Sequence, residues 1–157
     1  MSRIDFVTGN ALIYLPEVES LATVPDRVEA LVQQGGSTRA DAAGRGVARI
    51  LGDLVAYAEH DQVALHRMAW MSDPVIRPLD LNSAAEEEQW AAKRPADLLD
   101  RFTKAIAETV DLLKDQPDAA WGRAGLFPER RSFRQQVRRS AAHYDAELAA
   151  LKGAVGQ

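Results

Sequence analysis

The stretch that decides the fold is residues 132–152, SFRQQVRRSAAHYDAELAALK, near the C-terminal end of the chain. Its apolar residues recur at steps of three and four, which is the period of a helix buried along one side. His143 lies on this face, four residues before Glu147, so the two side chains can both contact one atom placed between them. A histidine and a carboxylate at this spacing can form half of a metal site. The apolar residues are Phe133, Val137, Ala141, Tyr144, Leu148 and Leu151.

The longest periodic segment, residues 47–71, offers candidates for the other half of such a site. It predicts a long helix that ends before Pro74, because the residue preceding a proline is pushed out of the α region. Asp53, Tyr57 and His60 lie on one stripe of this helix. An unpaired carboxylate is costly to bury, so Asp53 needs a partner.

Two further segments complete a set of four main helices. One starts near Thr23, a candidate N-cap, and ends at Gly35 and Gly36. The other covers residues 95–114, where apolar residues again follow the helical period. A short solvated helix is expected over residues 86–93.

The connecting segments contain no convincing strand. Residues 35–46 and 117–131 are interpreted as loops, and residues 72–83, with two prolines, as a long extended connection. The sequence therefore predicts an all-α fold, an antiparallel four-helix bundle with a long connection between its second and third helices. Facing helices of such bundles place metal sites on their inner surfaces.

The composition limits the function. The 157 residues suit one domain, residues 1–157, with residues 1–22 as a peripheral segment. The absence of cysteine excludes disulfides, thiolate zinc sites and a cysteine nucleophile. The net charge is −4, and no apolar run approaches the roughly 20 residues that cross a bilayer. We expect a cytoplasmic protein that binds neither nucleic acid nor membrane.

The remaining polar residues have simpler interpretations. Glu59 and Asp61 are expected to solvate their helix, and His66 to be a surface or packing residue rather than a ligand. The arginine-rich run that follows residue 129 is either a solvated helix face or an anion-binding rim, since arginine forks match carboxylates and phosphates. The run comprises Arg130, Arg131, Arg134, Arg138 and Arg139.

Five pieces of the sequence between residues 47 and 151 form a family-like pattern when taken in order. They are VARILGDL, RMAWMSDPVIRPLD, PADLLDRFTKAIAETVDLL, DAAWGRAGLFPERRSFRQQV and AAHYDAEL. Their order and spacing resemble the DinB-like (DinB/YfiT) superfamily of metal-dependent four-helix bundles. The resemblance covers about two thirds of the chain.

The resemblance implies a metal-ligand set that differs from the family pattern of three histidines. His143 matches the first histidine of the pair on the last helix, but Glu147 stands in place of the second. Asp53 falls where the family has an early histidine, and His60 is a weaker candidate that requires a shifted register. The implied metal ligands are therefore Asp53, His143 and Glu147.

Two outcomes are open for this set. Two carboxylates and one imidazole favour a harder divalent ion, iron, manganese or magnesium, over zinc or nickel. Alternatively, the three groups satisfy one another as a buried polar cluster without a metal, with His143 charged between the carboxylates.

At family level the resemblance implies transfer of a low-molecular-weight thiol to a small-molecule electrophile, or a related hydrolase or isomerase reaction. Arg123 and Arg130 are the candidates for holding a carboxylate of the substrate or cofactor. The alternative function is a non-catalytic, stress-linked helical module for binding or dimerisation. A homodimer is expected, because family members often pair and the apolar N-terminal segment suits an interface.

Overall fold

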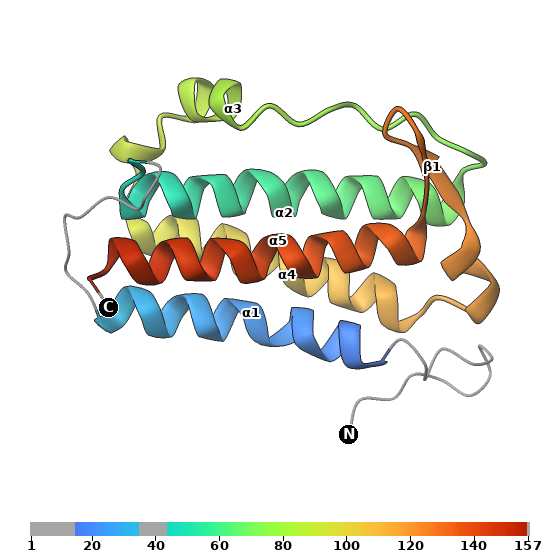
Figure 1. Cartoon of the computed structure of the whole chain (residues 1–157), viewed down its shortest axis with the longest axis horizontal. Coiled ribbons are helices and arrows are strands. Elements are labelled where there is room, and N and C mark those ends of the chain that lie inside the picture. The colour runs from blue at the N-terminus through green and yellow to red at the C-terminus, as the bar shows by residue number, and fades with distance from the viewer. Residues whose placement is uncertain (1–14, 35–43, 157) are drawn as a thin grey trace.

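The computed structural model describes residues 15–34 and 44–156 and confirms the predicted helical bundle (Figure 1). Two predictions lie outside the described residues. One concerns residues 1–14, most of the N-terminal segment expected at an interface, and the other is the helix stop expected at Gly35 and Gly36. In order, the elements are α1 (Leu15–Gln34), α2 (Val47–Trp70), α3 (Leu81–Glu88), η3 (Trp90–Ala92), α4 (Pro95–Lys114), η4 (Asp118–Gly122), β1 (Ala124–Leu126), β2 (Arg130–Ser132) and α5 (Phe133–Ala154).

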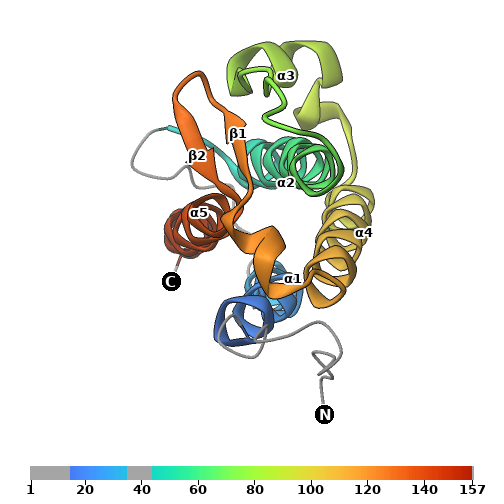
Figure 2. The same ribbon diagram turned by 90° about the vertical axis from the view of Figure 1, so that its right-hand side faces the viewer.

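The four long helices form a square in which α1 and α2 each pack against both α4 and α5 (Figure 2). The pairs α2–α5 and α1–α4 are antiparallel, whereas α2 and α4 run in the same direction (Figure 1). The long connection causes this arrangement, because it leaves the C-terminal end of α2 and returns along the bundle to the end where α2 began.

The core is a continuous cluster of apolar side chains from all four helices. The predicted stripe of α5 is buried except for Ala141, which is half-buried, and α4 buries Leu98, Phe102 and Ile106 as its period requires. Most of the stability of these helices comes from burial of their apolar faces and not from intrinsic helical propensity. Within the described residues, no helix combines the length and apolar character that a membrane span needs.

Helix α1 begins earlier than the sequence indicated. Thr23 is not an N-cap but lies inside the helix, where its hydroxyl donates to the carbonyl of Ser20 at 2.8 Å. Residues 15–22, expected to be peripheral, form the first turns of α1. The helix continues through Pro25 because one unbroken apolar face is buried on both sides of it, which offsets the proline penalty of about 3 kcal/mol. The buried residues of this face are Val18, Leu21, Val24 and Val28.

The short helix in the long connection is also displaced from its expected position. It is α3, which starts after Asp80, whose carboxylate accepts hydrogen bonds from the backbone of Asn82 and Ser83. This N-cap interaction, rather than the acidic run near residue 86, sets where the helix begins.

The returning end of the connection is fixed by Trp90. Its indole is buried against Gly52 of α2, so closely that a Cβ on Gly52 would lie 2.0 Å from Cγ of the ring. Arg101 of α4 reinforces this junction by pairing with Glu59 at 2.8 Å and with Glu88 at 3.2 Å. Residues of α2, η3 and α4 therefore meet around the Trp90 ring, over which the Arg101 guanidinium lies 5.5 Å from the centroid.

Residues 117–131, expected to be irregular, contain η4 and a small hairpin. Strand β1 pairs antiparallel with β2, and Leu126 pairs in addition with the long connection. Its N–H donates to the Pro74 carbonyl, and its carbonyl accepts from the Ile76 N–H, each at 2.9 Å. Strands of three residues are too short to show an alternating pattern, which explains why the sequence did not reveal them.

We predict that Gly52→Ala lowers the free energy of unfolding by about 2 kcal/mol or more, because the added methyl group overlaps the Trp90 indole. Gly153→Ala is the matched control: Gly153 also lies in a helix, and its Cβ would meet nothing within 4 Å. That change should be neutral or stabilising by up to about 1 kcal/mol. Urea denaturation measures both, and equal effects of the two substitutions would contradict the proposed contact.

Candidate functional site

The three residues proposed as metal ligands lie where the N-terminal half of α2 faces the C-terminal half of α5. Asp53 and Glu147 are buried, with exposed fractions of 1% and 7%. They are held by Arg45, whose Nη1 lies 3.1 Å from Asp53 Oδ2 and 2.8 Å from Glu147 Oε2. Its Nη2 donates to the second oxygen of Glu147 at 3.0 Å. The structure thus brings the two carboxylates together on one guanidinium group.

A second arginine completes the cluster. Arg49 lies one turn before Asp53 on α2 and donates from Nε to the other oxygen of Asp53 at 2.8 Å. Its Nη2 bonds to Asn82 at the start of α3. Among the described residues, these two guanidinium groups face two carboxylates, and all four carboxylate oxygens accept a hydrogen bond.

Arg45 is the residue that sequence reasoning missed. It lies in the segment interpreted as a loop, two residues before α2 begins, and its partner Glu147 is 102 positions away. The only local signal is the spacing of Arg45, Arg49 and Asp53 at intervals of four, which favours a charge-paired helix face.

His143 lies beside this cluster but makes no hydrogen bond to it. Its ring stacks on Tyr57 with centroids 3.8 Å apart, and its Nε2 is buried without a hydrogen-bond partner among the described residues. Burial lowers the pKa of His143; Arg45 lowers it further, while Glu147 and Asp53 act in the opposite direction. The lowered pKa favours the neutral imidazole, whereas the charged form was expected for a self-satisfied cluster.

The residues present do not fit a bound metal ion. One feature would suit a metal ion: the Nε2 of His143 pairs with none of the described residues, and a neutral imidazole nitrogen can serve as a metal ligand. The carboxylates oppose it, because Arg45 already places a cation between them and uses their oxygens. Within residues 15–34 and 44–156, no three histidine, aspartate or glutamate side chains are grouped so as to hold an ion.

We expect Arg45→Ala to lower the free energy of unfolding by about 3 kcal/mol, because it leaves Glu147 buried without this partner. The double variant R45L/E147L should recover most of the loss, since apolar replacements remove both buried charges. Arg94→Ala, which breaks an exposed pair with Asp97, serves as the control and should cause no measurable change. Chemical denaturation followed by circular dichroism tests this, and wild-type stability in R45A would refute the role of Arg45.

A second polar cluster lies further along the same helix interface, around Asp61. The sequence suggested that Asp61 solvates its helix, but its exposed fraction is 2%. Gln136 Nε2 and Ser140 Oγ, both on α5, donate to its two oxygens at 2.8 Å each. Tyr57 lies 3.3 Å from Ser140, and Arg131 donates to Gln136 at 2.7 Å. Asp61, which was expected to face solvent, is therefore buried in the interface between α2 and α5.

The protonation state of Asp61 follows from its burial. Burial raises the pKa of Asp61 to about 6, although hydrogen bonds from Gln136 and Ser140 and the charge of His60 act in the opposite direction. The Ser140 hydroxyl has one hydrogen but two acceptors in reach, Asp61 Oδ2 at 2.8 Å and the Gln136 carbonyl at 3.0 Å. A protonated Asp61 resolves this conflict, because it can donate to Ser140 while Ser140 donates to the carbonyl.

We predict that Asp61→Asn flattens the pH dependence of stability between about pH 4 and 6. In the wild type the folded pKa is raised above its ordinary value, so this contribution is complete below pH 4 and is lost as the pH rises through 6. The loss is at most about 3 kcal/mol, at about 1.4 kcal/mol for each unit of pKa. The asparagine amide can donate to Ser140 as the neutral acid does.

Urea denaturation of both proteins at several pH values measures this effect. Subtracting the variant from the wild type isolates Asp61 from His143, whose lowered pKa acts in the opposite sense as the pH falls. Parallel pH profiles for the two proteins would show that Asp61 is ionised in the fold throughout this range.

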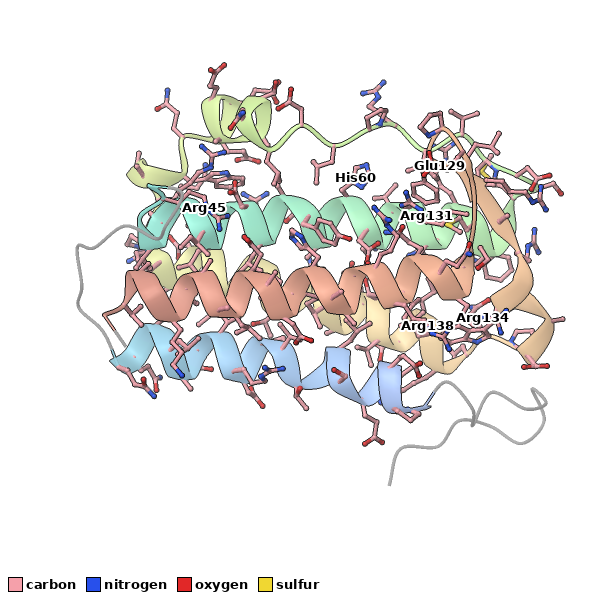
Figure 3. The ribbon with its side chains drawn as sticks, viewed as in Figure 1. Arg45, His60, Glu129, Arg131, Arg134 and Arg138 are labelled. Carbon is pink, nitrogen blue, oxygen red and sulfur yellow. The ribbon has the colours of Figure 1, made fainter. Side chains whose placement is uncertain are left out.

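The other proposed site residues lie away from the Arg45 cluster. His60 Nε2 donates to the carbonyl of Arg77 at 2.6 Å and so fixes the long connection on the outer face of α2. Arg123 and Arg130 lie beyond the C-terminal end of α2, which is about 25 Å from Asp53 along the helix at about 1.5 Å per residue. Figure 3 shows Arg45 at one end of the bundle and Arg131, with other arginines of the hairpin and α5, at the opposite end.

The comparisons with known proteins support the fold and go no further than that. The structure is similar to that of "YfiT from Bacillus subtilis", described as "a probable metal-dependent hydrolase with an unusual four-helix bundle topology". The TM-score is 0.81 at 16% sequence identity, over 88% of this chain and 83% of that one. No family model and no curated protein matches the sequence. The chain thus has the bundle fold that its resemblance to the DinB/YfiT group predicted.

Proposed function

We propose that this protein is a metal-independent helical binding module built on the DinB/YfiT-like bundle. The observation that carries the proposal is the guanidinium group of Arg45, which lies between Asp53 and Glu147 at hydrogen-bond distance from each. A catalytic metal needs open coordination positions for its substrate, whereas a guanidinium group offers none. The positive charge is supplied here without a Lewis acid.

The second candidate is a metal-dependent enzyme of the hydrolase, isomerase or thiol S-transferase type. The bare, buried Nε2 of His143 favours it, as does the likeness to YfiT, itself described as a probable metal-dependent hydrolase. It would require Arg45 to leave both carboxylates before a metal could bind. The two buried charges would then be left with Arg49 alone, which is costly.

An exposed apolar surface supports binding as the general role. The large hydrophobic residues that are exposed in the described chain all fall between residues 63 and 75, at the C-terminal end of α2 and in the loop after it. Trp70 has an exposed fraction of 76%. Tryptophan, methionine and arginine are enriched in protein interfaces, and Arg67 is adjacent to this surface. The exposed residues are Val63, Trp70, Met71 and Val75. The homodimer, which was expected through the apolar N-terminal segment, remains a prediction.

Metal analysis tests the proposal directly. Protein purified without chelators should contain far less than one equivalent of manganese, iron, nickel or zinc, and added Mn²⁺ or Ni²⁺ should not raise its melting temperature. Asp53, His143 and Glu147 are not grouped around an ion in the wild type, but Arg45→Ala frees Glu147 and one oxygen of Asp53 to turn toward His143. This variant should therefore gain a melting-temperature rise on adding either metal.

The double variant R45A/H143A is the control and should lose that gain, because the imidazole is the remaining neutral ligand. A stoichiometric metal in the wild type that disappears in His143→Ala would overturn the proposal and favour the metal-dependent enzyme.

A further inference from the structure

A cavity of about 530 Å³ lies at the end of the bundle opposite Arg45. Its wall is formed by the loop after α2, by η4 and by the two strands of the hairpin, so four separate segments converge on it. Its volume is in the range of pockets that bind small molecules. The lining residues that carry charge are Asp73, Arg123 and Arg130.

Each of the two arginines is held by one hydrogen bond to the residues that the structure describes and uses few of its donors there. Arg123 is half-buried, and its Nη2 donates to the carbonyl of Met71 at 2.8 Å. Arg130 donates from Nη1 to Asp73 at 2.8 Å. A guanidinium group has five N–H donors. Each of these two therefore retains donors for a ligand, in contrast to Arg45, which is shared between two carboxylates.

The charge of the cavity favours an anion. Two arginines against one aspartate leave the lining with one net positive charge, in a chain whose net charge is −4. A neighbouring hollow shares Arg130 and adds Arg131, Arg138 and Arg139, together with one carboxylate, Glu129, which pairs with Arg131 at 2.8 Å. The four arginines of this hollow outnumber its carboxylate and raise the positive potential at this end of the molecule, where Arg131, Arg134 and Arg138 lie (Figure 3).

The rest of the wall is made mostly of small apolar side chains, with Ser72 as its remaining polar residue. Ala119, Ala120 and Ala124 line it together with Pro117 and Met71. Such a wall gives an apolar body a contact surface without filling the space that the body would occupy.

We infer that this cavity binds a small organic anion, with a carboxylate or phosphate head group against Arg123 and Arg130 and an apolar body against the alanine wall. Guanidinium groups pair with both head groups through two parallel hydrogen bonds. The inference concerns the other end of the bundle from Arg45, so it goes beyond the proposed function and holds whether or not the chain binds a metal.

Calorimetric titration of the full chain with four probes tests this site. Benzoate and phenyl phosphate carry the two head groups on an apolar body, benzamide is the uncharged counterpart of benzoate, and inorganic phosphate is a head group alone. We expect saturable binding of benzoate, phenyl phosphate or both, and none of benzamide. Amide shifts of residues 119–125 in a ¹⁵N–¹H spectrum should place the ligand without any substitution.

Variants then assign the arginines. The double variant R123Q/R130Q should weaken binding by about tenfold or more, since it removes charge-assisted hydrogen bonds. Arg123→Lys keeps the charge but loses the fork and should weaken it less. Arg94→Gln, an exposed arginine on another element, should leave the affinity unchanged. Near-ultraviolet circular dichroism confirms that each variant is folded.

Three results would overturn the inference: no saturation by any anion at millimolar concentration, undiminished affinity in R123Q/R130Q, or amide shifts confined to the Arg45 end. Binding of inorganic phosphate as tight as that of phenyl phosphate would overturn the part assigned to the alanine wall.

Discussion

One guanidinium group resolves the main electrostatic conflict of this bundle. Asp53 on α2 and Glu147 on α5 are buried carboxylates close enough to share Nη1 of Arg45. Without a cation between them, the repulsion of two buried like charges opposes folding. Arg45 joins them through three hydrogen bonds, while Arg49 takes the remaining oxygen of Asp53. A metal ion could neutralise the same carboxylates, but it would leave positions open to a substrate. Arginine instead gives a closed cluster in which the charges of the described groups balance. The site then offers no open coordination position to a substrate.

The interface between α2 and α5 contains buried polar groups along much of its length, in contrast to the apolar cluster that fills the core. From the Arg45 cluster it continues through the stacked rings of His143 and Tyr57 to the hydrogen bonds of Asp61 and Ser140. Each buried polar group in this interface needs a partner, so the hydrogen bonds restrict how α2 and α5 can slide past each other. The bare Nε2 of His143 is its one unsatisfied point among these groups.

The molecule therefore has two different ends. At one end the Arg45 cluster is closed and its charges are matched, and Trp90 covers α2 nearby. At the other, the hairpin and the loop after α2 leave a cavity with incompletely used arginines, next to exposed apolar side chains such as Trp70. Because the long connection makes α2 and α4 run in the same direction, both helices end where η4 and the hairpin lead into α5 (Figure 1).

The sequence by itself determined the helices α2, α4 and α5, the capping box at Ser132 and the resemblance that predicted the bundle, because all of these depend on residues within a few turns of one another. It also indicated that Asp53 needs a buried partner, but it did not name Arg45. Only the tertiary structure decided that partner, because Arg45 and Glu147 are 102 positions apart and helical periodicity carries no information about contacts across such a distance. The start of α1, the burial of Asp61 and the hairpin were decided in the same way, by packing against segments that are remote in the chain.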